Sequence, residues 1–371
     1  MSVLFLEYNK RDSDHRGINR SLVKCFSESL TKAYVGCYTE YYENVFLDLD
    51  VNLVCKKSQG GSKGFYQAMF HEILSIFRFL IFSGCKPQKV VILSASPFGR
   101  LLYSIAFAFG FMRRSDIFFV MHSEYGVLFD DCQSLKRRVF RFILKFSLWV
   151  CRDKLTHVIL SRHIAIHRQY LGRHVLVLDH PVETLGDVED NRVASKVSDS
   201  GKSMVISFVG IASENKGFPQ FLTFREKLSG EPQFAFQVVG RVLGSYDVDP
   251  DAFDYFSYEY VSHSKMTELL SRTDVAIFFY GCDYDYIASG AVIDCIKFSI
   301  PIIALDSALF RDFSDRYNFV KVFHSIDEMV VFIKSKTAIN EFIDNSDFST
   351  VQYDFSIAQA VARIGSYQEG K

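Results

Sequence analysis

Short, uninterrupted apolar runs recur along the sequence and constrain its fold more than any other feature. Those in the first half are Val3–Glu7, Lys89–Ser94, Asp116–Met121, Val158–Ser161 and Val175–Leu178. A strand that is apolar on both sides must be covered on both faces, which is typical of a parallel sheet between layers of helices. Between these runs, the spacing of apolar residues predicts helices over Gly17–Leu30 and Leu101–Phe111. A turn at Pro97–Gly99 is predicted just before the second helix. The alternation predicts a Rossmann-like domain.

A second alternating series follows a polar stretch, residues 183–203, that lacks apolar periodicity and is predicted to be a linker. Its expected strands are Met204–Val209, Phe234–Val239, Val275–Phe279 and Pro301–Leu305, and its expected helices are Ser264–Ser271, Ser289–Phe298 and Ile326–Ser335. We therefore expect an N-terminal domain over 1–182, a C-terminal domain over 204–350 and a closing helix within 351–371. The fold class is α/β: two Rossmann-like domains whose parallel sheets face a central cleft, with ligands at the carboxyl ends of the strands.

Charge and composition exclude several classes of protein. The 42 Lys and Arg residues against 43 Asp and Glu give a net charge of −1. A nucleic-acid-binding protein needs a large basic excess, so we expect no nucleic-acid partner. An apolar share of 49% and a charged share of 23% indicate a globular chain rather than a disordered one.

Sequence motifs for common cofactors and metals are missing. No G-x-G-x-x-G follows a strand and no G-x4-G-K-[ST] occurs, which argues against NAD enzymes and P-loop nucleotidases. His163 and His167 lack the intervening acid of an H-E-x-x-H zinc motif. The eight cysteines form no CxxC pair, which favours buried free thiols in a reducing cytoplasm over disulfides or zinc. We expect neither a metal nor a cofactor.

Targeting and membrane-spanning patterns are also missing. The start of the sequence has no basic region followed by a long apolar segment, so it is interpreted as a first strand rather than a signal peptide. Leu101–Met112 is uncharged over only twelve residues, well short of the ~20 needed to span a bilayer. The expected location is cytoplasmic, with peripheral contact at the inner face of a membrane left open.

The first candidate site motif is the segment Phe208–Phe218, FVGIASENKGF. A strand ends at Val209, Gly210 allows a tight turn, and a helix begins near Pro219. Backbone N–H groups at such a helix start, with Lys216 beside them, can hold a diphosphate. The alternative is an ordinary loop with a solvated lysine.

The second candidate motif, Tyr284–Asp294, is the more specific one. Ser289 is a suitable N-cap, and Gly290 and Ala291 are small enough for close approach of a ligand. The positive end of the helix dipole would then point into the cleft. Asp294 lies one turn further along, where a carboxylate can accept hydrogen bonds from ribose hydroxyls. The alternative is a capped helix with a structural aspartate.

These motifs resemble those of family 4-like glycosyltransferases of the GT-B fold, and the resemblance extends over most of the chain. F-V-G-x5-K-G at Phe208–Gly217, which includes Ser213, is similar to the family's phosphate-anchoring loop. Tyr286–Asp294 and the strand that follows are similar to its donor-binding helix and next strand. The strand Ile117–Met121, which ends in His122-Ser123-Glu124, is similar to the N-terminal strand whose histidine lies near the donor sugar.

The resemblance implies a glycosyltransferase, a hexosyltransferase of class EC 2.4, that uses a nucleotide-sugar donor without a metal. It implies a glycan or lipid-linked acceptor in bacterial surface polysaccharide synthesis, and it favours retention of configuration. His122 or Glu124 would stabilise charge near the sugar in a retaining route, or deprotonate the acceptor in an inverting one. Arg16 and Gly17, after the first strand, would then contact donor phosphate or acceptor.

The sequence also departs from the family pattern. Two glutamates often stand eight positions apart in the family, where this chain has Tyr286 and Asp294, with Asp285 next to the first. The arginine that usually precedes the loop lysine is missing, and Arg241 is proposed to supply its charge. Two other functions therefore stay open: a GT-B nucleotide-sugar epimerase, and a non-catalytic subunit that binds nucleotide sugars or glycans.

Residues 133–150 are predicted to form an amphipathic helix. Arg137, Arg138, Arg141 and Lys145 fall within an arc of ~100°, while Phe140, Ile143, Phe146 and Trp149 lie elsewhere on the helix. A basic face of this kind would suit an anionic membrane surface and a lipid-linked acceptor. The alternative is a surface helix whose apolar side packs on the sheet.

Overall fold

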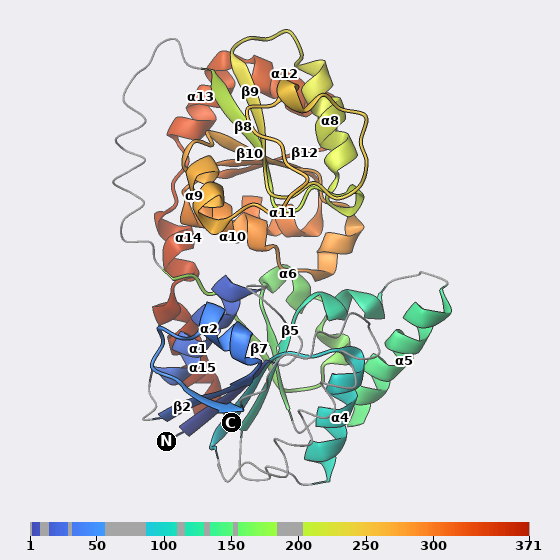
Figure 1. Ribbon diagram of the computed structural model, residues 1–371, viewed down its shortest axis with the longest axis vertical. Helices are drawn as coiled ribbons and strands as arrows, with labels where there is room; N and C mark the ends of the chain where they lie inside the picture. Colours follow the sequence, from blue (N-terminus) through green and yellow to red (C-terminus); the bar gives the residue numbers. More distant parts are fainter. Residues whose placement is uncertain are drawn as a thin grey trace. The chain divides into compact units, whose positions relative to one another are not determined.

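The computed structural model describes residues 2–7, 15–28, 32–55, 87–109, 116–129, 134–150, 155–183 and 203–370, without the side chains of residues 54, 55, 123, 124, 282 and 283 (Figure 1). Two compact units make up the chain. The N-terminal unit comprises Met1–Glu183, Tyr286–Ala288 and Phe355–Lys371, and the C-terminal unit comprises Thr184–Asp285 and Ser289–Asp354. Each unit is built on one parallel sheet, which confirms the α/β fold class.

The sheet of the N-terminal unit has the order β3-β2-β1-β4-β5-β6-β7. Its strands are β1 (Ser2–Glu7), β2 (Lys32–Cys37), β3 (Asn52–Cys55), β4 (Lys89–Ser94), β5 (Asp116–Met121), β6 (Thr156–Ile159) and β7 (Val175–Val177). The order reverses between β1 and β4, because the chain moves outward in one direction from β1 and in the other from β4. Such a switch point leaves a crevice at the carboxyl ends of the two strands.

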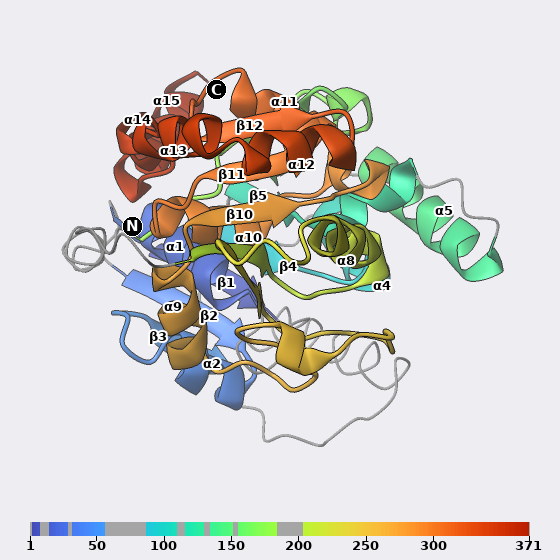
Figure 2. The ribbon, with the colours of Figure 1, turned by 90° about the horizontal axis from the view of Figure 1, so that it is seen from above.

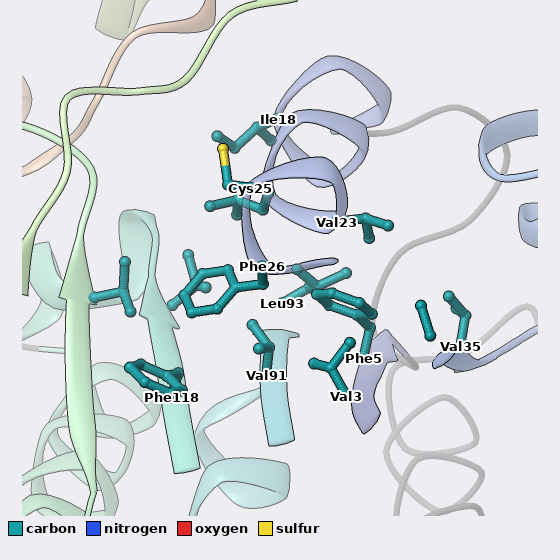
Figure 3. Packing of buried hydrophobic residues seen from close by; sticks show 14 of the residues in the cluster. Val3, Phe5, Ile18, Val23, Cys25, Phe26, Val35, Val91, Leu93 and Phe118 are labelled. Carbon is teal, nitrogen blue, oxygen red and sulfur yellow. The ribbon is translucent and has the colours of Figure 1, made fainter. Parts of the chain in front are cut away.

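Helices cover both faces of this sheet. They are α1 (Arg16–Ser27), α2 (Thr39–Val45), α4 (Pro97–Ala108), α5 (Leu135–Val150), the short α6 (Arg162–Ala165) and α15 (Ile357–Glu369), with single 3₁₀ turns at Ser123–Leu128 and Arg168–Tyr170. On one face, Val3 and Phe5 of β1 pack against Phe26 of α1 (Figure 3). On the other, Leu4 packs with Tyr103 of α4. Apolar side chains on both sides of β1 therefore lie in two separate cores.

The sheet of the C-terminal unit has the order β12-β11-β10-β8-β9. Its strands are β8 (Met204–Val209), β9 (Phe234–Val239), β10 (Val275–Phe278), β11 (Ile302–Leu305) and β12 (Val320–Phe323). Its helices are α8 (Phe218–Lys227), α9 (His263–Ser271), α10 (Gly290–Lys297), α11 (Ala308–Ser314), α12 (Ile326–Lys334), α13 (Lys336–Asp344) and α14 (Ser349–Asp354), with 3₁₀ turns at Glu214–Lys216, Pro250–Ala252 and Cys282–Tyr286. The strand order reverses between the adjacent strands β8 and β10, which creates the switch point of this unit.

The predicted turn at Pro97–Gly99 is wrong, because α4 already begins at Pro97. Ser96 is the N-cap, and its side chain accepts a hydrogen bond from the backbone N–H of Gly99. Proline suits the first helical position, where its missing N–H leaves no hydrogen bond unmade. The turn residues are therefore the first turn of the helix.

The expected closing helix is present as α15, and the shorter helix α14 precedes it. Phe355 lies between α14 and α15, and its backbone oxygen accepts a hydrogen bond from Val182 N at 2.8 Å. The helix α15 belongs to the N-terminal unit. The predicted linker lies outside the described residues over 184–202. None of the described helices is long and apolar enough to cross a membrane.

Candidate functional site

The carboxyl ends of β8 and β10 lie side by side at the switch point of the C-terminal unit, and both predicted site motifs begin there. The chain runs from β8 through Gly210 into a 3₁₀ turn that ends at Lys216 and then into α8. From β10 it runs through a second 3₁₀ turn into α10. This is the place where open parallel sheets hold ligands.

Two glycines bring the loops after β8 and β9 into backbone contact. Gly210 has φ +99° and donates from its N–H to Val239 O at 2.9 Å, and Gly240 has φ +151°. A Cβ at Gly240 would lie 2.2 Å from Gly210 O, which no side chain tolerates. Ala212 N donates to Arg241 O at 2.9 Å, so the backbone of Arg241 adjoins this loop, while its side chain is exposed.

Lys216 and the first turn of α10 meet beside Gly210. The position that a Cβ would take at Gly210 is 3.1 Å from Lys216 Nζ and 3.1 Å from the Cβ of Ala291. Burial lowers the pKa of Lys216, and the nearby carboxylate of Asp294 opposes that change. Within the described residues the Lys216 ammonium makes no hydrogen bond or ion pair. A partly buried cation of this kind is suited to an anionic ligand.

The amino end of α10 presents unused hydrogen-bond donors. Ser289 is its N-cap, and the side chain accepts from Val292 N at 3.3 Å. The N–H groups of Gly290 and Ala291 have no hydrogen-bond partner in the described part of the chain, and a Cβ at Gly290 would meet open space. These donors add to the positive end of the helix dipole. The arrangement can bind a phosphate group.

Asp294 lies one turn further along α10. Burial raises its pKa from the ordinary 3.8 to about 6, although Lys297 and Lys216 both act in the opposite direction. Its carboxylate has no hydrogen-bond partner among the described residues and is only partly buried. It can therefore accept hydrogen bonds from hydroxyl groups of a ligand when it is ionised.

Tyr280 is a site residue that sequence reasoning missed. Its hydroxyl lies 2.8 Å from Ser289 Oγ, and its ring stacks on Tyr284 with centroids 3.8 Å apart. Burial raises the pKa of Tyr280 well above 10, so the phenol stays neutral and holds the N-cap serine in place. A tyrosine just beyond an apolar strand gives no signal that separates this role from core packing.

The amides at the start of α8 do not fit the prediction that they hold phosphate. Lys216 N and Phe218 N both donate to Ser213 O at 3.1 Å, and Gly217 N donates to Glu214 O at 2.9 Å. These three groups are used within the turn itself, because the 3₁₀ turn closes on the same carbonyls. The ammonium of Lys216, rather than these amides, is what this loop offers to a ligand.

Asp285 and Tyr286, two further predicted donor-binding residues, both have contacts of their own in the described structure. Asp285 Oδ1 accepts a hydrogen bond from Ala308 N at the start of α11, at 3.2 Å. Tyr286 belongs to the N-terminal unit, where its ring stacks on Phe129 at 4.1 Å and meets His167 at 4.8 Å. The side chain of Asp285 thus caps a helix, and that of Tyr286 is part of an aromatic cluster.

In the N-terminal unit His122 directly follows β5. Its Nε2 is 2.7 Å from Leu93 O, and because a carbonyl only accepts, Nε2 carries the hydrogen and Nδ1 is the basic nitrogen of the neutral ring. The ring of His15 lies 4.7 Å away. Arg16 and Gly17 are exposed at the start of α1. The side chain of Glu124 lies outside the described residues.

A buried polar cluster at the β1/β4 switch point was also missed. Glu7 is fully buried and accepts from Ser94 Oγ at 2.6 Å and from Asn19 Nδ2 at 3.0 Å. Asn19 also donates to the hydroxyl of Tyr41 at 2.8 Å. The sequence signal for this cluster was a glutamate, Glu7, at the end of an apolar strand. Among the described residues no group of three or more His, Cys, Asp or Glu side chains is placed to hold a metal.

Comparison by sequence gives no relative. No protein-family model matches the chain, and no curated protein matches it. Membership of glycosyltransferase family 4 therefore stays a prediction.

Comparison by structure gives similar folds along the whole chain. HepE from Anabaena, solved with UDP and glucose, is 11% identical with a TM-score of 0.65, and the match covers 100% of both chains. The catalytic domain of starch synthase IV from Arabidopsis thaliana, solved with ADP and acarbose, is 12% identical with a TM-score of 0.61, over 97% of this chain and 99% of that one. UDP-GlcNAc 2-epimerase from Neisseria meningitidis, bound to UDP-GlcNAc, is 12% identical with a TM-score of 0.57 over 100% of both. The chain has the GT-B fold.

Proposed function

We propose that the protein is a glycosyltransferase whose C-terminal unit binds a nucleoside diphosphate sugar. The observation that carries this proposal is the partly buried ammonium of Lys216, which has no ion-pair partner within the described residues, beside the open amino end of α10. A pyrophosphate brings two negative charges and several acceptor oxygens to one place. Lys216 and the N–H groups of Gly290 and Ala291 offer the matching positive charge and donors.

The same groups would assist the chemistry. As the bond between the anomeric carbon and the phosphate oxygen breaks, negative charge grows on the departing diphosphate, and Lys216 with the α10 donors stabilises it. The anomeric carbon passes through an oxocarbenium-like state and forms a bond to an acceptor hydroxyl oxygen, whose proton leaves to a base. The carboxylate of Asp294 would accept hydrogen bonds from the ribose hydroxyls.

The finer parts of the proposal rest on the resemblance to family 4-like enzymes. They are retention of configuration, a glycan or lipid-linked acceptor, and a role in bacterial surface polysaccharide synthesis. His122 is the proposed catalytic residue of the N-terminal unit. The solved complexes of HepE with UDP and of starch synthase IV with ADP support a nucleoside diphosphate as the donor's leaving group.

Binding of nucleotides to purified protein tests the donor site. We expect isothermal titration calorimetry to detect one of UDP, GDP and ADP, with CMP as a single-phosphate comparison. Lys216→Ala should weaken that binding at least tenfold, because a charge-assisted hydrogen bond contributes about 1.5–3 kcal/mol. Lys336→Ala, at an exposed lysine of α13 in the same unit, is the matched control and should bind normally. Equal affinity in both variants would falsify the assignment.

A second function, nucleotide-sugar epimerisation, is favoured by the similar fold of the Neisseria meningitidis UDP-GlcNAc 2-epimerase. A turnover assay distinguishes the transferase function from the epimerase function. A transferase consumes the nucleotide sugar in proportion to acceptor, whereas an epimerase interconverts sugars with no acceptor present. We expect acceptor-dependent release of the nucleoside diphosphate, and we expect His122→Ala to lower kcat while nucleotide affinity stays unchanged. Acceptor-independent interconversion would replace the transferase proposal with the epimerase.

A further inference from the structure

An exposed apolar stripe runs along the whole length of α5. Its members are separated by four, three, four and three residues, which places them on one face of a helix. They are Leu135, Val139, Phe142, Phe146 and Trp149, with exposed fractions of 78%, 43%, 71%, 41% and 70%. The ring of Phe146 stacks on those of Phe142 and Trp149, with centroids 6.4 Å and 5.8 Å apart. Contiguous exposed apolar surface of this extent marks an interaction site.

This stripe is not the face that holds α5 in the N-terminal unit. Ile143, Leu144 and Leu148 are buried, and the latter two lie in a core cluster with Ile159 of β6. The alternative from the sequence, a surface helix whose apolar side packs on the sheet, therefore accounts for these buried residues but not for the stripe. The helix has two apolar faces, and within the described residues the stripe is the exposed one. Figures 1 and 2 both show α5 at the outer margin of its unit.

Basic side chains follow one edge of the stripe. Arg138, Arg141 and Lys145 are three and four residues apart, and none of them pairs with a carboxylate in the described part of the chain. Arg141 Nε donates to Val127 O at 3.1 Å, and Lys145 lies over the ring of Tyr170 at 5.6 Å. Residues 135–150 contain five Lys and Arg and no Asp or Glu.

We propose that α5 binds an anionic membrane surface, with its apolar stripe among the lipid chains and Arg138 and Lys145 at the lipid phosphates. The charge of the helix selects this partner. A second copy of α5 would bring two sets of five positive charges together, whereas an anionic lipid surface neutralises them. Aromatic rings beside basic residues suit the boundary between headgroups and acyl chains. The proposal rests only on the N-terminal unit and stands whether or not the chain is a glycosyltransferase.

The single tryptophan of the sequence makes the proposal directly measurable, because Trp149 is a member of the stripe. With vesicles of phosphatidylglycerol and phosphatidylcholine, we expect the tryptophan emission of the full chain to shift to shorter wavelength. Brominated lipid chains should quench it. Vesicles of phosphatidylcholine alone should cause neither change. A shift of equal size with both vesicle types, or with neither, overturns the proposal.

Two variants with matched controls separate membrane binding from general effects. In vesicle co-sedimentation, Arg138→Glu with Lys145→Glu should lower the partition coefficient by about tenfold or more, since each basic residue near an anionic surface contributes about fivefold. Lys32→Glu with Lys336→Glu makes the same charge change at two exposed lysines elsewhere and should leave binding nearly unchanged. An equal decrease in the partition coefficient of the two double variants would show that only net charge matters, and would contradict the assignment of membrane binding to α5.

The apolar half of the proposal is tested by Phe142→Ser against Val331→Ser, a change at a residue of α12 with the same degree of exposure, 70%. Only the first should reduce vesicle binding, by tenfold or more. Circular dichroism checks that both variants are folded. If sedimentation velocity instead shows a dimer of the unmodified chain that Phe142→Ser dissociates, the stripe is an interface between copies and the membrane proposal is wrong.

Discussion

Gly240 illustrates how a single residue can hold the candidate site together. Its φ of +151° and the 2.2 Å that would separate a Cβ from Gly210 O exclude any side chain. Gly230 also has positive φ, +89°, but a Cβ there would meet nothing within 4 Å. A comparison of the two glycines therefore separates the cost of backbone strain from the cost of a steric clash.

We expect Gly240→Ala to lower the free energy of unfolding by about 2–4 kcal/mol more than Gly230→Ala, for which strain alone costs about 1 kcal/mol. Chemical denaturation of the two variants measures the difference. Similar costs at both positions would mean that the loops after β8 and β9 separate readily, and that Gly240 does not fix the position of Gly210.

Asp294 makes stability depend on pH. Burial raises its pKa from 3.8 to about 6, so the folded state holds the proton more tightly than the unfolded state does. The stabilising contribution of the protonated group is complete below about pH 4 and is lost as the pH rises through 6. The loss is on the order of 3 kcal/mol.

Asp294→Asn removes this titration. Relative to the unmodified protein, the variant should gain stability between pH 4 and pH 7, measured by denaturant unfolding at a series of pH values. Asp285→Asn is the control, because that carboxylate caps α11 and lies elsewhere in the unit. A stability difference between Asp294→Asn and the unmodified protein that does not change with pH would contradict the raised pKa of the partly buried Asp294.

Local chemistry explains which site residues could be predicted. Gly210, Lys216 and Ser289 follow directly from strand ends and a capping pattern, which are local in sequence. The contacts of Tyr286 with Phe129 and His167 join residues more than a hundred positions apart, and no local pattern indicates them. The same holds for Glu7 and Ser94, which meet only because β1 and β4 are neighbours.

At the scale of secondary-structure elements, a buried polar network ties strand to helix in the C-terminal unit. The two N–H groups on Nε2 of Gln237 in β9 face three acceptors: Ser207 Oγ of β8 at 2.8 Å, Thr273 Oγ1 at 2.9 Å and Leu269 O of α9 at 2.9 Å. All three contacts are buried. Burial without such partners is costly, so the network fixes how α9 packs on the sheet.

Gln237→Ala should therefore cost about 2–4 kcal/mol, from the lost hydrogen bonds and the cavity that remains. Gln233→Ala, at an exposed residue just before the same strand, should change stability by less than about 0.5 kcal/mol. Differential scanning calorimetry compares them. Equal melting temperatures in the two variants would show that α9 is held by its apolar contacts alone.

The strength of the apolar run, rather than the position in the sheet, decided which strands could be predicted. β4, β5, β8 and β9 have the predicted bounds, because uninterrupted apolar runs mark them. β3 and β12 lie at the edges of their sheets and are four residues long, with polar residues such as Asn52 and Lys321 among them. Short strands that contain polar residues leave only a weak apolar run, and such a run is hard to recognise in a sequence.

At the scale of the whole molecule, the two ends of the chain belong to one unit. Residues after Phe355 return to the N-terminal unit, where Ala360 and Ile364 of α15 join the core beside α1. The fully buried carboxylate of Asp179 pairs with Arg363 of α15 at 2.7 Å. The return explains why a division at 183 alone does not give a complete N-terminal unit.

The hydrogen bond from Val182 N to Phe355 O brings the point of exit next to the point of return. A flexible linker of about six residues, which reaches roughly 13 Å, can replace residues 184–354. We expect this shortened chain to unfold cooperatively when followed by the fluorescence of Trp149. Residues 1–183 alone should lack a cooperative transition, because the apolar face of α1 and the carboxylate of Asp179 lose their cover. If the two chains are equally stable, α15 is an accessory to a core that is already complete, and the N-terminal unit would be expected to fold before the rest of the chain is made.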